Sequence, residues 1–220
     1  MKTSLVGISR RSLITFAGLA LAAGGAGFAW YAMRRAAGPK SRYVEVAHGV
    51  YMLAEPEVLA DFELIKHDNT PFSNPAFKDR WSFLIFGYTF CPDFCPTTLV
   101  VFDQVHRMLT QQPGSGLDVQ FAMVSVDPER DTVRQLKAYV PHFNSAFIGL
   151  TGNSTMIRRL TDSIGADYEK QVGSTADNYL IDHSTAVYLI NPKGRLQGIF
   201  APSHEAADMV QGFQKIREGT

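Results

Sequence analysis

Apolar residues follow three different patterns along the chain, and each pattern predicts a different kind of element. The stretch 13–33 is mostly apolar and holds no charged side chain, and it has the length of a helix that spans a bilayer. Near-continuous apolar runs at 81–88 and 119–126 predict strands that are covered on both faces of a sheet. Elsewhere, apolar residues recur every three or four positions, as on the buried face of a helix.

The order of these elements predicts an α/β fold. Besides the two apolar runs, strands are expected at 43–46, 62–65, 146–150, 168–172, 179–190 and 196–200. Helices are expected at 96–110, 132–140, 154–164 and 204–217, with Asp131 or Thr132, and Ser203, as N-caps and Gly165 as a C-terminal stop. Alternating strands and helices that end in a hairpin and a helix are typical of a thioredoxin-like α/β sandwich.

The N-terminal region divides into three predicted parts: a basic segment at 1–12, the apolar stretch 13–33 and a connector at 34–57, ahead of the domain at 58–220. Residues 9–14, Ser-Arg-Arg-Ser-Leu-Ile, resemble a twin-arginine export signal, which would mark a bacterial exported protein. The absence of a clear Ala-x-Ala cleavage site favours a retained transmembrane anchor over a removed signal. Basic residues flank the stretch on both sides, so the positive-inside rule does not fix its orientation.

Composition excludes two classes of protein. The 220 residues carry 21 basic and 21 acidic side chains and no net charge, so nucleic-acid binding has no electrostatic support. Two cysteines are too few for a disulfide-rich scaffold. Without its N-terminal region the chain has the length of one domain.

Both cysteines lie on the predicted turn between the strand at 81–88 and the helix from Pro96. Cys91 and Cys95 are four residues apart, so a helical turn places both sulfurs on one face. A helix N-terminus favours the thiolate form, and two thiolates are soft ligands that suit Cu(I) or zinc. A structural disulfide is the less favoured interpretation, because so small a loop stabilises little.

Two sulfurs seldom complete a metal site, and His183 is the candidate third ligand. It begins an apolar strand that is predicted to be central, and in a thioredoxin-like sheet the loop before this hairpin faces the cysteine turn. Asp182 is expected to accept a hydrogen bond from the imidazole ring. A role for His183 that does not involve a metal stays open. Ordinary surface or capping roles are expected for the other histidines, His48, His67, His106, His142 and His204.

Three aromatic residues lie beside the cysteines in the sequence. Tyr88, Phe90 and Phe94 are expected to shield the site, although core packing is an equal possibility for Phe90. Asp93, between the two cysteines, is expected to stabilise the turn, and tuning of the site's charge or of partner docking is the less favoured alternative.

Four stretches together resemble the Sco/SenC family. They occur in the family's order at 86–97 (FGYTFCPDFCPT), 124–132 (VSVDPERDT), 147–152 (FIGLTG) and 182–184 (DHS). The likeness covers roughly 58–217. It departs from the family at Asn69-Thr70, where members often carry a glycine in an early hairpin turn.

The resemblance implies a thioredoxin-like protein that assists assembly of the copper A centre of cytochrome c oxidase. It implies that Cys91, Cys95 and His183 bind copper, as Cu(I) or Cu(II). The copper is then delivered to oxidase subunit II, or the cysteines of that subunit are reduced, or both. A copper donor and a thiol reductant are the further expected partners. The globular part is expected in the periplasm, held at the bacterial inner membrane by 13–33.

Two other functions remain open for the cysteine pair. A thiol–disulfide oxidoreductase would use Cys91 as nucleophile and Cys95 as resolving thiol, or the reverse. Such enzymes usually have Cys-x-x-Cys and a cis-proline opposite the site, whereas here the spacing is longer and Ser184-Thr185 follow His183. A peroxidase that forms a sulfenate on Cys91 is the third and least favoured hypothesis. A metallochaperone without enzyme activity is the preferred prediction.

Overall fold

The computed structural model describes residues 42–110, 119–171, 179–202 and 205–219. The predicted basic segment at 1–12 and membrane span at 13–33 lie outside the described residues. Among the residues that are described, no helix has both the length and the apolar character needed to cross a membrane.

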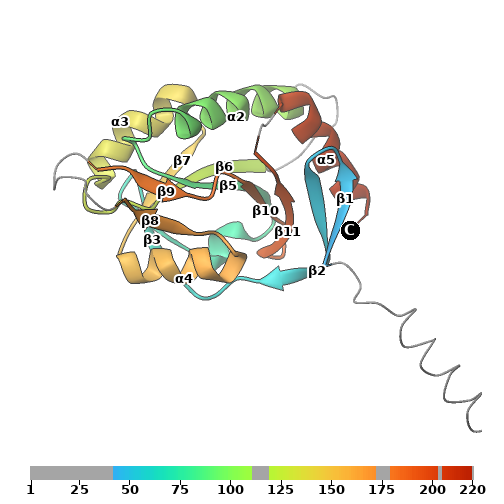
Figure 1. The fold of residues 1–220 in the computed structure, drawn as a ribbon, viewed down its shortest axis with the longest axis horizontal. Helices are drawn as coiled ribbons and strands as arrows, with labels where there is room; N and C mark the ends of the chain where they lie inside the picture. Colours follow the sequence, from blue (N-terminus) through green and yellow to red (C-terminus); the bar gives the residue numbers. More distant parts are fainter. Residues whose placement is uncertain (1–41, 111–118, 172–178, 203–204, 220) are drawn as a thin grey trace, which may run out of the picture. The chain divides into compact units, whose positions relative to one another are not determined.

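A nine-stranded mixed sheet forms the centre of the domain (Figure 1). Its strands, in spatial order, are β1 (Tyr43–Ala47), β2 (Val50–Val58), β11 (Arg195–Phe200), β10 (Val187–Ile190), β5 (Trp81–Gly87), β6 (Val119–Ser125), β7 (Ile148–Thr151), β3 (Glu63–Lys66) and β4 (Pro71–Ser73). The pairs β5–β6 and β6–β7 are parallel and the other pairs are antiparallel.

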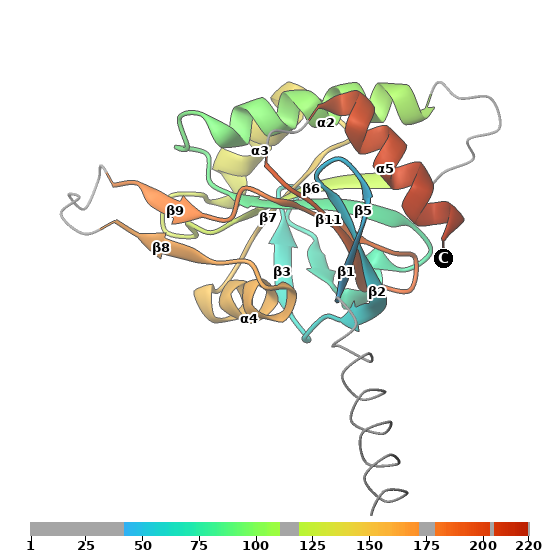
Figure 2. The same ribbon diagram turned by 45° about the vertical axis from the view of Figure 1, so that its right-hand side comes forward.

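Helices cover both faces of this sheet, which confirms the predicted α/β sandwich. The helices are α2 (Phe94–Thr110), α3 (Val133–Phe143), α4 (Ser154–Ile164) and α5 (Ala206–Glu218), with a short 3₁₀ helix η1 at Asn74–Phe77. Figures 1 and 2 show α2, α3 and α5 on one face and α4 on the other. A separate two-stranded sheet pairs β8 (Tyr168–Lys170) with β9 (Ile181–His183).

The central strand β5 joins the two cores. All seven of its residues are buried. Phe83 and Ile85 pack in the core beneath α2, α3 and α5, whereas Leu84 and Phe86 pack in the core on the α4 side. A strand buried on both faces needs apolar residues at nearly every position, so the near-continuous apolar run predicted this strand correctly.

Helix ends follow the predicted caps in part. The Thr132 hydroxyl accepts a hydrogen bond from the Gln135 N–H at the start of α3, and Gly165, with φ of 70°, ends α4 in the left-handed conformation. Helix α5 begins at Ala206 after an N-cap at Glu205. The predicted cap Ser203 lies outside the described residues.

The segment at 34–57 was expected to be a connector, but from Tyr43 onward it forms strands of the sheet. Strand β2 pairs along β11, and the compact unit of the domain begins at Arg42. Antiparallel pairing with β11 satisfies the backbone of β2, and Pro56 lies where the register of this pair is irregular. The early hairpin turn also closes without the family's glycine, because Asn69 adopts a φ of 68°, a conformation that asparagine tolerates.

Candidate metal centre

One half of the site is the turn between β5 and α2. Cys95 lies in the first turn of α2, and the Cys91 N–H donates a hydrogen bond to the Tyr88 carbonyl at 3.1 Å. The side chains are 8% exposed at Cys91 and 2% exposed at Cys95, and both cysteines are free thiols. At Gly87, a Cβ atom would lie 2.4 Å from the Cys95 sulfur, so this position has to be glycine for the sulfur to lie where it does.

The other half of the site is His183 on β9. Its Nε2 lies 3.6 Å from the Cys91 sulfur and 3.7 Å from the Cys95 sulfur. The three ligand atoms all lie within 4.8 Å of one another, and among the described residues this is the group of His, Cys, Asp or Glu side chains found close enough to hold a metal ion. The structure therefore brings together the three residues that the sequence singled out.

The surroundings of His183 differ from the prediction. It ends β9 instead of starting a central strand, and β10 begins only at Val187. The break arises because the Ser184 N–H donates to the Asp167 carbonyl and its hydroxyl accepts from the Asp167 N–H, which holds this segment away from the main sheet. Asp182 is turned elsewhere, since its carboxylate accepts a hydrogen bond from Gln171.

A backbone carbonyl orients the imidazole in place of Asp182. The Nδ1 atom of His183 lies 3.1 Å from the Ser184 carbonyl oxygen. Because a carbonyl only accepts, we assign a proton to Nδ1, and in the neutral ring this leaves the Nε2 lone pair directed toward the two sulfurs. This is the tautomer that a metal ligand requires.

The two thiols share one negative charge. The hydrogen bond from Cys95, with a smaller contribution from His183, lowers the pKa of Cys91 to about 3 against the opposing effect of burial. The hydrogen bond to Cys91 and burial raise the pKa of Cys95. Burial lowers the pKa of His183, but its contacts with Cys91 and the Ser184 carbonyl outweigh burial, and the net pKa is raised.

The spacing of the three atoms fits a metal ion. Metal–sulfur bonds of about 2.3 Å and metal–nitrogen bonds of about 2.0 Å, set about 120° apart, separate sulfur and nitrogen by about 3.7 Å. The observed separations of 3.6 and 3.7 Å match this value. The set of two sulfurs and one imidazole at these separations therefore suits a soft ion in low coordination.

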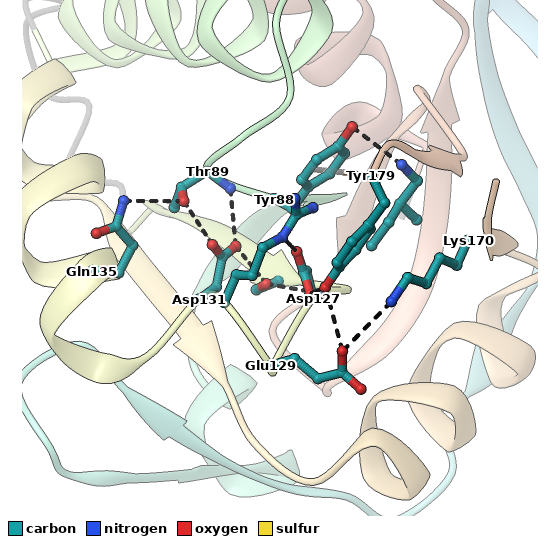
Figure 3. Close-up of polar contacts among 11 residues, drawn as sticks. Tyr88, Thr89, Asp127, Glu129, Asp131, Gln135, Lys170 and Tyr179 are labelled. Atoms are coloured by element: carbon teal, nitrogen blue, oxygen red, sulfur yellow. Dashed lines mark hydrogen bonds and ion pairs between the residues drawn. The ribbon is translucent and has the colours of Figure 1, made fainter. Parts of the chain in front are cut away.

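Asp131 supports the turn that carries Cys91 (Figure 3). Its carboxylate accepts hydrogen bonds from the N–H and hydroxyl of Thr89, at 2.9 and 2.6 Å, and from the Ser125 hydroxyl at 2.6 Å. Burial raises the pKa of this carboxyl group. Asp131 is thus a buried acceptor that ties the end of β6 to the cysteine turn, and the helix cap is Thr132.

A cluster around Arg130 holds the chain that leads into β9. The guanidinium carbon lies 3.5 Å from the centre of the Tyr179 ring, and the guanidinium pairs with Asp127. The Tyr179 hydroxyl donates to the same carboxylate at 2.5 Å, and the Lys170 ammonium also contacts the ring, at 3.5 Å (Figure 3). Sequence reasoning did not predict this cluster, although charged residues directly after a buried strand were its visible sign.

The three aromatic residues beside the cysteines separate into two groups. Tyr88 is 2% exposed and lies in the core with the cysteines. Phe90 and Phe94 are 51% and 56% exposed, so core packing, one of the two possibilities for Phe90, is wrong. Asp93 contributes to the turn through its carbonyl, which accepts hydrogen bonds from the N–H and hydroxyl of Thr97.

Two of the other histidines have contacts outside the metal centre. The Nδ1 atom of His67 accepts a hydrogen bond from the Gly149 N–H. The ring of His106 packs edge-on against Phe121 and Phe147. His204 lies outside the described residues.

Comparison with known proteins gives the family. The SCO1/SenC family profile matches residues 51–218. The protein SCO2 homolog, mitochondrial, of Mus musculus is 32% identical over 209 residues, which are 95% of this chain and 79% of that protein. The crystal structure of Arabidopsis thaliana ScoI with copper bound is 33% identical, with a TM-score of 0.67, over 73% of this chain and 99% of that one.

A second solved structure agrees. Bradyrhizobium japonicum ScoI with copper bound is 26% identical, with a TM-score of 0.63, over 73% of this chain and 98% of that one. The predicted thioredoxin-like fold is confirmed by these neighbours. With a family profile that spans most of its length, the chain belongs to the SCO1/SenC family.

Proposed function

We propose that the chain is a copper chaperone that binds one copper ion through Cys91, Cys95 and His183 and helps to mature the copper A centre of cytochrome c oxidase. The observation that carries this proposal is the convergence of two sulfurs and one imidazole nitrogen within 4.8 Å. Soft thiolates favour Cu(I), and two similar proteins have been solved with copper bound.

Copper is the cargo of this site. In the reduced protein the two thiolates and neutral imidazole hold Cu(I) in low coordination, whereas Cu(II) takes a further oxygen or water ligand.

The exposed Phe90 and Phe94 lie on either side of Cys91 in the cysteine turn. Aromatic side chains are frequent anchors in protein interfaces. This turn is therefore suited to contact a partner whose thiolates take the metal by ligand exchange.

The redox state of the cysteines controls loading. Oxidation joins the Cys91 and Cys95 sulfurs in a disulfide, with loss of two electrons and two protons to the disulfide of an oxidised partner. A disulfide offers no thiolate to the metal, so the oxidised protein does not hold copper. A thiol reductant returns the two electrons and two protons and restores the site.

The proposed setting is the bacterial inner membrane. Residues 13–33 anchor the chain as a single-pass helix, and the export-like motif at 9–14 places the domain in the periplasm. Subunit II of cytochrome c oxidase is the proposed recipient, with a separate copper donor and a thiol reductant as further partners.

One observation favours a second candidate function, that of a thiol–disulfide oxidoreductase acting on the cysteines of the oxidase subunit. The pKa of Cys91 is lowered to about 3, so this sulfur is a thiolate at neutral pH, and Cys95 lies beside it. The Cys91 thiolate attacks a partner disulfide and displaces one partner thiolate. Cys95 then loses its proton, attacks the mixed disulfide and releases the second partner thiol as the Cys91–Cys95 disulfide forms.

Copper stoichiometry in two redox states tests the proposal. The full chain is titrated with copper after reduction and again after oxidation, with Cys91→Ser as the control. We expect one copper per reduced chain and none per oxidised chain or control. No copper in either state, together with a readily cycled disulfide, would reject the chaperone function in favour of the oxidoreductase function. A reduced, loaded chain should also transfer its copper to a recipient fragment that carries the two copper A cysteines.

A further inference from the structure

Tyr88 lies between the two halves of the metal centre. Its carbonyl accepts the hydrogen bond of the Cys91 N–H at 3.1 Å. Its ring meets the His183 ring edge-on, with the ring centres 5.8 Å apart and the planes at 90°. Backbone and side chain of one residue therefore contact a ligand from each half.

The Tyr88 hydroxyl makes a third contact, to the strand that carries the histidine. It accepts a hydrogen bond from the Ile181 N–H at 3.2 Å (Figure 3). Ile181 is buried and precedes His183 by two residues on β9. Because β9 pairs with β8 and does not belong to the nine-stranded sheet, this hydrogen bond links β9 to the residue that directly follows β5.

We propose that Tyr88 is a positioning residue for His183. Its ring sets the orientation of the imidazole and its hydroxyl sets the position of β9, so that Nε2 lies at one distance from both sulfurs before the metal arrives. The inference rests on the proposed function, since it concerns how the same three ligands meet. Residues that orient metal ligands contribute to affinity because the ligands need no reorganisation on binding.

The competing explanation is that Tyr88 only fills the core in which it lies. Tyr88→Phe separates the two, because it keeps the ring and removes the oxygen alone. Tyr139→Phe is the matched control, since the Tyr139 hydroxyl is also buried but has no hydrogen-bond partner among the described residues. A packing role predicts that both variants behave like the parent chain.

Amide hydrogen exchange tests the positioning of β9 in the metal-free, reduced chain. In Tyr88→Phe we expect the Ile181 amide to exchange about two- to tenfold faster, the range for one neutral hydrogen bond, with β5 unchanged. In Tyr139→Phe we expect no change at Ile181. An Ile181 amide that exchanges equally in parent and Tyr88→Phe would overturn the proposal, whatever the chain does with copper.

Copper coordination gives the second readout. We expect Tyr88→Phe to weaken Cu(II) binding about tenfold, within the range for residues that orient metal ligands, and to weaken the nitrogen coupling of the copper electron-spin signal. His183→Ala gives the Cu(II) affinity and the nitrogen coupling for complete loss of the histidine ligand. An unchanged affinity and nitrogen coupling in Tyr88→Phe, beside a clear loss in His183→Ala, would reject the positioning role alone. No loss in His183→Ala would reject the three-ligand site itself.

Discussion

The two halves of the metal centre are built in different ways. The cysteine half is one continuous segment, in which β5 leads through a short turn into α2, and both sulfurs belong to the buried core. The histidine half is the end of β9 in a separate two-stranded sheet. It is held by the Tyr88 hydroxyl, the Ser184 backbone and the stack of Arg130 on Tyr179.

This difference indicates which ligands have positions fixed by the local fold and which have adjustable positions. The cysteines are four residues apart in sequence, so the local fold determines how they meet. His183 reaches them across 92 and 88 residues of sequence, so its position depends on a few tertiary contacts. We therefore expect copper binding to tolerate damage to the histidine half better than damage to the cysteine half.

Cys91→Ser should have the largest effect. It replaces the sulfur that carries the negative charge with a hard hydroxyl, which is a poor ligand for Cu(I). We expect Cu(I) affinity to fall by more than the roughly 10–100-fold that changes around a metal site usually cost. Competition with a Cu(I) chelator measures it. A loss below tenfold would mean that Cys91 is not a ligand.

His183→Ala should separate the two oxidation states. Two thiolates still hold Cu(I), because this soft ion accepts low coordination, whereas Cu(II) favours imidazole nitrogen. We expect about a 100-fold loss of Cu(II) affinity and a smaller loss for Cu(I), measured by chelator competition. Equal losses for both ions would contradict the division of roles between the halves.

Acid should weaken Cu(I) binding through both halves. The raised pKa of Cys95 means that this thiol keeps its proton at neutral pH, so copper must displace it and affinity rises about tenfold per pH unit. Below the raised pKa of His183 a second proton is displaced and the slope approaches two. In His183→Ala the slope should stay near one. Titrations at several pH values measure both, and a flat profile would contradict this assignment.

Gly87→Ala should disturb the cysteine half by contact alone. The new Cβ would lie 2.4 Å from the Cys95 sulfur, so this sulfur has to move, at a cost of about 1–3 kcal/mol in unfolding free energy and about tenfold in Cu(I) affinity. Gly198→Ala is the matched control, because its Cβ meets Ile216 Cδ1 at 2.7 Å far from the metal centre. Denaturation should show comparable destabilisation in both variants. Copper titration should show weaker Cu(I) binding only in Gly87→Ala.

Asp182→Asn should have the smallest effect. Its carboxylate accepts a hydrogen bond from Gln171, and the imidazole ring of His183 is instead oriented by the Ser184 carbonyl. We expect a change in Cu(II) affinity below about threefold, the lower side of outer-shell effects. A larger loss in the same chelator assay would restore Asp182 as the residue that orients the imidazole.

Local patterns predicted the cysteine half well and the histidine half less well. The apolar run of β5 and the Cys-x-x-x-Cys spacing lie within one segment, so periodicity was sufficient. In the run at 179–190, Asp182, Ser184 and Thr185 interrupt the apolar residues, and the resulting break depends on bonds to Asp167 that no local pattern reveals.

Two further differences have the same origin. Strand β2 contains Pro56 and two glutamates, so it was predicted as part of a connector, although pairing with β11 makes it a strand. Asp131 is of a residue type that is favoured at helix N-caps, yet its carboxylate is buried against Thr89 and Ser125. Cap preference describes the local chain and does not identify a partner 42 residues away.

The central claim is that two cysteine sulfurs from one half and one histidine nitrogen from the other hold a single copper ion. X-ray absorption of the reduced, Cu(I)-loaded full chain counts these ligands directly. We expect two sulfur neighbours and one imidazole nitrogen, with the nitrogen absent in His183→Ala. A spectrum with two sulfurs alone, or one that His183→Ala leaves unchanged, would contradict it.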